Sequence, residues 1–554
     1  MSRPSPAPLP QAFDLAARAR TISLQLTAWP SVTGSKDEAV FALRLAGMLR
    51  ALPYFQANPA DLVVAPLPGD PLGRANVLAL VRGRGTRTVT LSGHFDTVTT
   101  EDYGPLQDLA GEAEALRDAL IAKLEATGAD PLALADLKSG DFLPGRGLLD
   151  MKSGLAAGIA ALEAFAAEPD RDGNLLLIAT PDEEDRSAGM RAAADLLPGF
   201  LAERGLDAKL GINLDAINDP EDGEYARVVA FGCIGKLLLS AFVVGKEAHA
   251  AYPFDGVNAA YLAAELVSEM ECAPELAEDA CGELAAPPTA LGSRDLKNQY
   301  NVTVPGTVWT YWNVLIHRRP STEIMAVART IAQRAVDRAR ARLAERAARL
   351  RVPVEVTPAW NAIRIVSFAE VKGAAMARDP GFEARFADLA EALAQRPDLD
   401  LPTRARQLTE AAWQASGLAG PAVVLGFGSM PYPSVTWRDE DAELRRDVLA
   451  AAQETAAAHG TSIRGIDYFP AIADMSYLGP VDAKDLAAAA SETPLWGNSI
   501  RWNLSQGATP GIPLINIGPW GRDYHHWLER VHAPYAFEVL PAIVQAVARR
   551  VLSG

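Results

Sequence analysis

Histidine and carboxylate side chains stand where short apolar segments of this sequence end. His94 and Asp96 follow the strand-like run 88–92, and residues two apart on a strand project from the same face. A carboxylate so placed can fix the tautomer of a histidine and leave its other ring nitrogen free to bind a metal ion. Taken alone, the pair is more typical of an ordinary hydrogen-bonded contact.

Other acidic residues and one histidine have the same placement. Asp150 lies in a glycine-rich turn before an Ala-rich helical stretch, four acids follow the next strand-like run at 182–185, and Asp215 ends another run. His525 lies just past the last such run. Open α/β sheets bind ligands at the carboxyl ends of their strands. The plain alternatives are a helix N-terminal residue for Asp150 and a solvated turn for the four acids.

Five residues from separate segments have similar places near predicted strand ends. This favours a metal site over a chance arrangement. Two histidines and three carboxylates suit a pair of divalent ions of the zinc type with one carboxylate bridging, and the same ligands would accept cobalt or manganese. The five residues are His94, Asp150, Glu184, Asp215 and His525. Two such ions can share a hydroxide and polarise a carbonyl, which is the chemistry of hydrolysis. Cys233, Cys272 and Cys281 lack CxxC spacing, so we expect no thiolate site.

The elements that must position these residues alternate between strand and helix, which predicts an α/β fold with a mostly parallel central sheet and flanking helices. Around Cys233 the pattern changes to α+β, so we expect a lid domain inserted into a discontinuous first domain. The predicted units are residues 1–232, 233–425 and 426–554. A helical stretch from Tyr103 to Gly140 is expected to be surface decoration.

Composition narrows the classes of function. The chain has 554 residues, of which 49% are hydrophobic and 22% charged, as in ordinary globular proteins. A net charge of −17 argues against nucleic acid and anionic membranes as partners. No signal peptide or membrane-spanning stretch is recognisable, so we expect a cytoplasmic protein.

Four segments resemble the dinuclear-zinc exopeptidases and amidohydrolases of the carboxypeptidase G, acetylornithine deacetylase and succinyl-diaminopimelate desuccinylase type. They are Gly93-His-Phe-Asp-Thr-Val, Gly145-Arg-Gly-x-x-Asp-Met-Lys-Ser-Gly, Thr180-Pro-Asp-Glu-Glu-Asp, and Gly518-Pro through His525 to Glu529. Gly245-Lys-Glu-Ala-His249-Ala-Ala resembles the lid signature of that family. The helical insertion and Tyr468-Phe-Pro-Ala-Ile-Ala-Asp-Met-Ser-Tyr are similar to its arginine-utilisation (RocB-type) subgroup.

The resemblance implies a role for each matching residue. His94 and Asp215 would bind one metal ion, Glu184 and His525 the other, and Asp150 would bridge them. Asp96 would orient His94. Glu183 would be the general base that takes a proton from the attacking water and returns it to the leaving amine. The adjacent His526 stays open as an alternative ligand, because His525 is chosen only by its spacing to Glu529.

Further implied residues lie in the predicted lid. His249 would stabilise the developing oxyanion of the scissile carbonyl, and in many relatives it comes from the partner subunit of a dimer. A homodimer is therefore possible, and the size of the insert also allows a monomer. Asn301, Arg318 and Arg319 occupy positions of substrate-binding residues, although a solvated basic pair explains the two arginines equally well.

The leading prediction is a zinc-dependent metallopeptidase or amidohydrolase. Its substrate would be a small peptide or N-acyl amino acid, cleaved by a dipeptidase, carboxypeptidase or deacylase. The alternative is a non-enzymatic relative that uses the fold to bind ligands or partners, yet no ligand or base is missing from the sequence. The chain contains neither a complete GxGxxG nor a P-loop nor a GxSxG elbow, which argues against nucleotide enzymes and serine hydrolases.

Overall fold

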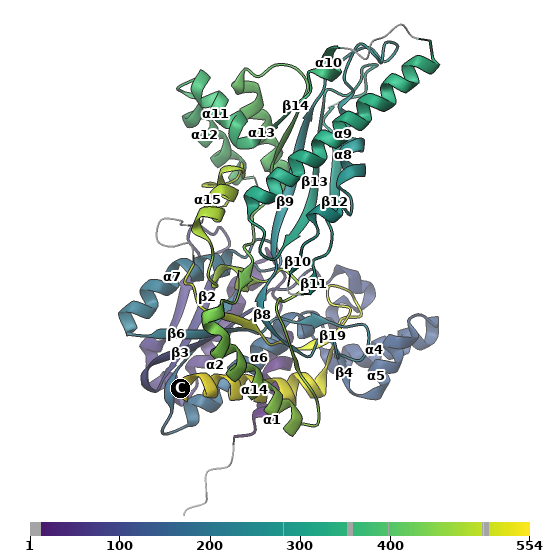
Figure 1. Ribbon diagram of the computed structural model, residues 1–554. Helices are drawn as coiled ribbons and strands as arrows, with labels where there is room; N and C mark the ends of the chain where they lie inside the picture. The colour runs from purple at the N-terminus through teal and green to yellow at the C-terminus, as the bar shows by residue number, and fades with distance from the viewer. Residues whose placement is uncertain are drawn as a thin grey trace, which may run out of the picture.

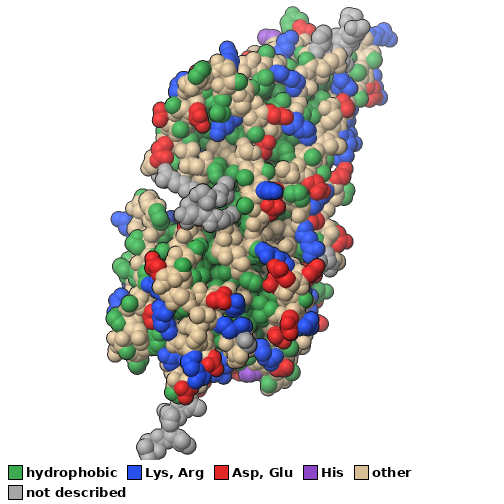
Figure 2. Space-filling view, turned by 60° about the vertical axis from the view of Figure 1, so that its left-hand side comes forward, with side chains coloured by type: hydrophobic (Ala, Val, Ile, Leu, Met, Phe, Trp, Pro, Cys, Tyr) green, Lys and Arg blue, Asp and Glu red, His purple; other side chains and the backbone are tan. Residues whose placement is uncertain are grey.

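Two bodies, each built on its own β-sheet, lie one above the other along the long axis of the molecule (Figure 1). The computed structural model describes residues 13–280, 282–297, 299–351, 358–396, 398–500, 502 and 509–553. Cys281 lies outside these residues, while Cys233 and Cys272 are free thiols. Acidic and basic side chains are interspersed over both bodies on the face drawn in Figure 2.

The lower body contains a nine-stranded mixed sheet. Its strands are, in spatial order, β1 (Leu62–Pro66), β2 (Ala75–Arg82), β5 (Asp172–Thr180), β3 (Arg84–His94), β6 (Asp207–Asn213), β18 (Leu514–Asn516), β8 (Val228–Cys233) and β16 (Val435–Thr436), with β17 (Arg464–Ile466) beside β8. The central strands β5, β3, β6 and β18 are parallel, whereas β1, β2, β8 and β16 pair antiparallel. The predicted parallel arrangement therefore holds at the centre, where His94 ends β3.

Helices cover this sheet in the way that the apolar spacing predicts. The helices of this body are α1 (Leu15–Thr27), α2 (Lys36–Arg50), α3 (Pro53–Ala57), α6 (Ser153–Ala167), α7 (Ala188–Arg204), α14 (Ala442–Ala458) and α16 (Leu540–Ser553). Helices α1, α6 and α16 pack together beneath β3 and β5, and α2 and α7 contact β2. Helix α6 is buried along nearly its whole length, which explains its Ala-rich and almost uncharged sequence.

A four-stranded sheet at the side of the lower body carries the helical insertion. Its strands are β4 (Phe142–Pro144), β20 (Arg530–His532), β19 (Trp520–Arg522) and β7 (Ile217–Asn218). The insertion forms α4 (Ala113–Thr127) and α5 (Pro131–Ser139). Four of their leucines, Leu116, Leu120, Leu124 and Leu137, are buried together with Leu528 of the His525 loop. The expectation of surface decoration is therefore wrong, because this insertion shares a core with a segment of the predicted site.

The upper body is a five-stranded sheet between two helical layers. The strands are, in order, β12 (Thr289–Asp295), β13 (Thr307–Ile316), β9 (Gly235–Val244), β15 (Ala422–Phe427) and β14 (Arg364–Ser367). Odd-numbered residues of β9 such as Leu239 pack under α8 (Ala259–Met270) and α9 (Ser321–Arg349). Phe242 on the opposite face belongs to the cluster of α11 (Phe368–Arg378), α12 (Phe382–Ala394) and α13 (Leu401–Ser416).

Short elements complete both bodies. They are β10 (Asp279–Ala280), β11 (Glu283–Leu284), α10 (Pro358–Asn361) and α15 (Ala483–Ser491). Helix α15 lies within the segment 426–554 that was predicted to belong to the catalytic domain, yet it packs on α9, and Ala489 is buried in the core of the upper body. Among the described residues, none of the helices is long and apolar enough to cross a membrane.

Candidate metal centre

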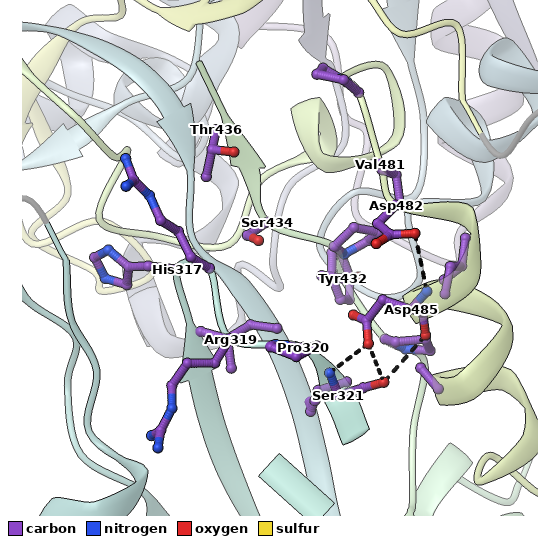
Figure 3. Close-up of a pocket in the computed structure, with 18 residues that line it drawn as sticks. His317, Arg319, Pro320, Ser321, Tyr432, Ser434, Thr436, Val481, Asp482 and Asp485 are labelled. Atoms are coloured by element: carbon purple, nitrogen blue, oxygen red, sulfur yellow. Dashed lines mark hydrogen bonds between the residues drawn. The ribbon is translucent and has the colours of Figure 1, made fainter. Parts of the chain in front are cut away.

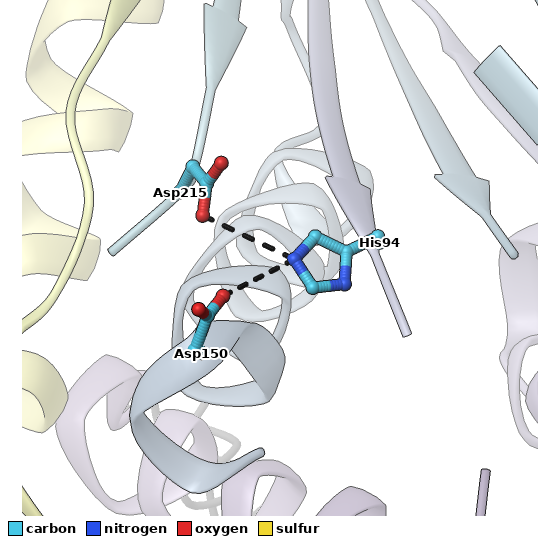
Figure 4. A group of neighbouring side chains, drawn as sticks. All are labelled: His94, Asp150 and Asp215. Atoms are coloured by element: carbon cyan, nitrogen blue, oxygen red, sulfur yellow. Dashed lines mark hydrogen bonds and ion pairs between the residues drawn. The ribbon is translucent and has the colours of Figure 1, made fainter. Parts of the chain in front are cut away.

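His94 lies at the end of β3 with its ring almost wholly buried. Its Nδ1 is 3.1 Å from the carbonyl oxygen of Asp96 and 3.6 Å from a carboxylate oxygen of the same residue. Its Nε2 faces the other way, 3.2 Å from Oδ1 of Asp150 and 4.0 Å from Oδ1 of Asp215 (Figure 4). Asp96 thus contacts one side of the ring, and two carboxylates converge on the nitrogen that remains.

His525 occupies the equivalent place on the other side of Asp150. Its Nε2 lies 3.2 Å from Oδ2 of Asp150 and 3.1 Å from both carboxylate oxygens of Glu184. The two oxygens of Asp150 therefore face different histidines. The ligand atoms of His94, Asp150 and Asp215 lie within 4.8 Å of one another, and so do those of Asp150, Glu184 and His525.

The neighbouring His526 has a different environment. Its Nδ1 accepts the backbone N–H of Leu528 at 3.3 Å, and its own backbone N–H is bound by the carbonyl of Asp523. No hydrogen bond or ion pair in the described part of the chain joins its ring to the carboxylates. The geometry favours His525 as the ligand.

Asp96 also fixes the acidic turn that follows β5. Its Oδ1 accepts the backbone N–H of Glu183 at 3.1 Å, and its Oδ2 accepts that of Glu184 at 3.2 Å. The hydroxyl of Thr33 donates to Oδ2 at 2.9 Å. One buried carboxylate therefore contacts the first metal-site histidine and the backbone of the turn that carries the next two predicted residues.

The turn begins at a buried ionic network rather than in solvent. Asp182 has a positive φ of 69°, and its carboxylate pairs with the guanidinium of Arg74. Glu38 accepts the backbone N–H of Asp182 at 3.1 Å and pairs with Arg74 at 3.2 Å. A solvated acidic turn does not describe this segment, because Asp182 and Glu38 are both buried. Sequence reasoning missed Arg74 and Glu38, because they are far from the acids along the chain and no local pattern marks them.

Backbone contacts place the other two carboxylates. Glu529 accepts the backbone N–H of Leu149 at 3.2 Å and of Asp150 at 3.4 Å. Gly518 lies so close to Asp215 that a Cβ there would be 1.8 Å from the carbonyl oxygen of Asp215. A larger residue at 518 would displace the strand end that carries this ligand.

The charges of the cluster fit divalent cations. Burial, with the nearby Asp150 carboxylate, raises the pKa of Asp215 to about 8. Burial lowers the pKa of His525, but hydrogen bonds to Asp150 and Glu184 outweigh it and raise the pKa to about 10. Buried carboxylates this close together repel one another unless a positive charge lies between them. Imidazole nitrogens and carboxylate oxygens are the donors that zinc and similar ions take, so this donor set fits such ions.

Glu183 stands beside both triads and belongs to neither. Its Oε2 is 3.9 Å from Nε2 of His94, and burial raises its pKa well above the usual range. Asp474, for which the sequence suggested no role, is a buried neighbour that accepts the hydroxyl of Thr180 at 3.0 Å. Burial raises the pKa of Asp474 to about 6, which its position among other carboxylates reinforces. Its place in an apolar run was the only sequence signal that it is buried.

The structure does not bring the predicted lid residues to this cluster. His249 and Asn301 lie together beyond the end of β9 that is remote from the lower body: His249 forms a bridge with Thr303, whose backbone N–H donates to Asn301. Ten residues of β9 at about 3.3 Å each separate that end from the lower body by roughly 30 Å.

Arg318 and Arg319 follow β13 and have partners elsewhere. Arg318 Nε donates to the hydroxyl of Tyr468 at 2.9 Å, and Arg319 pairs with Glu323 at 2.9 Å. Both line a cavity of about 330 Å³ at the junction of the two bodies, shown in Figure 3, where Asp485 accepts the backbone N–H of Ser321. No ligand of either triad lines this cavity.

Sequence comparisons identify the relatives of this chain. The model of Peptidase family M20/M25/M40 matches residues 117–463. Protein YqjN of Bacillus subtilis (strain 168) is 31% identical over 521 residues, which cover 94% of this chain and 93% of YqjN. Protein RocB of the same strain is 30% identical over 551 residues, covering 97% and 96%. Succinyl-diaminopimelate desuccinylase of Xanthomonas campestris pv. campestris (strain B100) is 33% identical over 201 residues, covering 36% of this chain and 46% of that enzyme.

Solved structures show the same fold. A tripeptidase from Staphylococcus aureus subsp. aureus Mu50 superposes with a TM-score of 0.50 at 16% identity, covering 98% of this chain and all of that one. The dipeptidase Dug1p from Saccharomyces cerevisiae gives 0.50 at 9% identity, covering 98% and 100%. The fold, the two triads and the relatives define a metal-dependent hydrolase. The chain belongs to peptidase family M20/M25/M40.

Proposed function

We propose that this enzyme hydrolyses an amide bond of a small peptide or N-acyl amino acid, using two divalent metal ions held by the two triads. The observation that carries the proposal is the geometry of Asp150, whose two oxygens lie 3.2 Å from the nearest nitrogens of His94 and His525. Such ions would polarise the scissile carbonyl and make water a nucleophile near neutral pH. Zinc is our first choice of metal, with cobalt or manganese as alternatives.

Glu183 is assigned as the general base. A general base needs a carboxylate that is not itself bound to a metal ion. Glu183 lies beside the triads without belonging to either. Burial raises the pKa of Glu183, and two bound cations would lower it again, so the ionised carboxylate could take a proton from the attacking water and deliver it to the leaving amine. Asp96 contacts the backbone of Glu183 and the ring of His94, and so holds the proposed base and the proposed ligand in fixed positions relative to each other.

We further propose a homodimer in which His249 serves the site of the partner subunit. Within one chain, roughly 30 Å of strand separates His249 from the lower body. Large apolar side chains are exposed around it, with Tyr300 91% and Tyr252 65% exposed. A surface of this kind suits contact with a second copy. Asn301 lies on the same surface and is assigned to the substrate of that partner site.

Residues 1–232 and 426–554 are assigned to the catalytic domain and 233–425 to the lid. The start of β9 at Gly235 fits the first boundary, whereas β15 runs to Phe427 and α15 packs on the upper body. The similarity to RocB along nearly the whole chain supports a place in arginine utilisation. The free thiols Cys233 and Cys272 are consistent with the expected cytoplasmic location. The substrate-binding role of Arg318 and Arg319 stays a prediction.

Hydrolysis of a panel of dipeptides and N-acyl amino acids by the metal-loaded protein tests the proposal. We expect release of free amino acid from at least one of them and no release by Glu183→Gln, whose metal content should match the wild type. A panel with no turnover under zinc, cobalt and manganese would contradict the assigned reaction.

A further inference from the structure

The hairpin that carries His525 begins with two like charges facing each other. Strands β19 and β20 pair Arg522 directly with Arg530, and the loop 523–529 joins them. Both arginines are buried, with 8% and 1% of their surfaces exposed. Like charges directly opposite on neighbouring strands repel, and burial removes the water that would screen them. This pair therefore needs a counter-charge.

Asp136 of the helical insertion supplies it. The guanidinium of Arg522 donates to both carboxylate oxygens of Asp136, and Arg530 Nε donates to Oδ2 at 2.8 Å. Asp523 contacts the other side of Arg530 at 2.5 Å. One buried carboxylate from α5 thus holds the two ends of the loop together. Its partners lie nearly 400 positions away in sequence.

The loop itself also rests on the insertion. Leu528 is buried in the cluster formed by leucines of α4 and α5, and Trp527 packs against that cluster. The ammonium group of Lys123 in α4 lies 4.0 Å from the centre of the Trp527 ring. Arg146, next to the Asp150 turn, pairs with both Asp102 and Glu529. The insertion therefore contacts the loop through apolar packing and through Lys123, while Arg146 connects the Asp150 turn to Glu529 at the end of the loop.

This support matters because the loop is held in an unfavourable backbone conformation. Asp523 and His525 have positive φ angles of 57° and 62°, which residues with a Cβ adopt only when surrounding contacts impose them. The His525 side chain is itself 43% exposed, and besides the carboxylates its ring contacts Tyr524 of the same loop. The position of this ligand depends on the base of the loop.

We propose that the helical insertion, acting through Asp136, is a positioning element that sets His525 and thereby the affinity of the second metal position. This inference rests on the proposed metal centre. Asp136 contacts neither His94, Asp150 nor Asp215. Glu529, which accepts the backbone N–H of Asp150, is itself held by Arg146, so the first position should lose much less affinity than the second. The insertion thus controls how many ions the centre holds, without contributing a ligand.

Counting bound ions in Asp136→Asn tests the proposal without any substrate. Cobalt titration followed by visible absorption, in competition with a chelator, reports each position separately. We expect the wild type to bind two ions, and Asp136→Asn to keep most of the first affinity and lose at least about tenfold in the second. Glu125→Gln, which breaks an exposed ion pair with Lys138 on the same insertion, should behave as wild type.

Further variants separate positioning from folding. Asp136→Glu should recover part of the second affinity, and adding His525→Ala to Asp136→Asn should lower it no further than His525→Ala alone. If Asp136→Asn does not fold, Leu528→Ala loosens the same loop without leaving a buried charge and should show the same selective loss. Equal loss at both positions, or wild-type affinity at both in a folded variant, would overturn the inference. Selective loss in a protein that cleaves no amide would uphold it and contradict the proposed reaction alone.

Discussion

Oδ1 of Asp96 accepts the backbone N–H of Glu183 at 3.1 Å while it lies 3.6 Å from Nδ1 of His94. One carboxylate atom therefore connects the proposed base with the histidine of the first triad. Its other oxygen binds the backbone of Glu184 in the second triad. The first strand end and the acidic turn are thus fixed relative to each other before any ion binds.

Replacing Asp96 with alanine should disturb both triads at once. The ring of His94 loses its orienting partner, and the backbone of the acidic turn loses two acceptors. We expect metal affinity to fall by about 10- to 100-fold, with a matching loss of activity. Asp185→Ala, at the exposed end of the same acidic run, is the control and should keep both properties. Normal metal affinity in Asp96→Ala would show that Asp96 does not act as an orienting residue.

Glu183→Gln should separate catalysis from metal binding. The amide keeps the shape of the side chain but cannot take a proton, so turnover should fall by at least about 100-fold. Metal content should stay at the wild-type level, whereas Glu184→Gln should lose the ion of the second triad. Steady-state kinetics and elemental analysis of the same preparations provide the check. Retained turnover in Glu183→Gln would remove it from the role of base.

Alanine substitutions of His525 and His526 should have different effects on the number of bound metal ions. His525→Ala is expected to lose the second ion, since its Nε2 faces Asp150 and Glu184. His526→Ala should retain it, because that ring accepts the backbone N–H of Leu528 and, among the described residues, forms no hydrogen bond or ion pair with the carboxylates. Metal counting on the two variants decides between them, and the opposite pattern would make His526 the ligand.

A dimer that shares His249 predicts complementation between two inactive variants. Glu183→Ala removes the base of its own site, whereas His249→Ala removes the histidine that the chain supplies to the site of its partner. A mixed dimer should contain one site with both residues intact, so equal mixing after subunit exchange should restore up to about a quarter of wild-type activity. No recovery, despite demonstrated exchange, would place His249 in its own site or outside the mechanism.

Metal uptake should release protons. The pKa of His525 is raised to about 10 and that of Asp215 to about 8, so both groups are largely protonated at pH 7 before an ion binds. Ligands must be deprotonated, so metal affinity should rise with pH between 7 and 9. An indicator dye in weakly buffered solution would measure the release on adding zinc to chelator-treated protein. A pH-independent affinity would show that His525 and Asp215 are already deprotonated at pH 7.

Three of the proposed metal ligands, His94, Glu184 and Asp215, could be grouped from sequence because each follows one of the parallel strands β3, β5 and β6, whose carboxyl ends meet at one edge of the sheet. Asp150 precedes α6 and His525 lies in the loop between β19 and β20, so for these two residues a position at a strand end was not sufficient. The inserted sheet was also evident from the change of pattern near Cys233. The antiparallel strands at the edges of the nine-stranded sheet were not evident, because a short buried run has the same composition in a parallel and in an antiparallel strand.

Contacts between distant polar residues could not be predicted. Arg74 and Glu38 look like ordinary helix and loop charges, and only the fold buries them against Asp182. Asp136 is one of several acids in the helical stretch 103–140, and nothing in the sequence distinguishes it. Arg319 was singled out for substrate binding, and its ion pair with Glu323 was not foreseen from the sequence. Pairing of this kind depends on which surfaces meet, which no local pattern records.

The measurement that tests the shared metal centre most directly is the metal content of Asp150→Ala beside the wild type, His94→Ala and His525→Ala. A carboxylate shared by two ions predicts about two equivalents in the wild type, about one in each histidine variant and almost none in Asp150→Ala. A wild type that binds no ion after reconstitution, or an Asp150→Ala variant that keeps both, would contradict a centre bridged by Asp150.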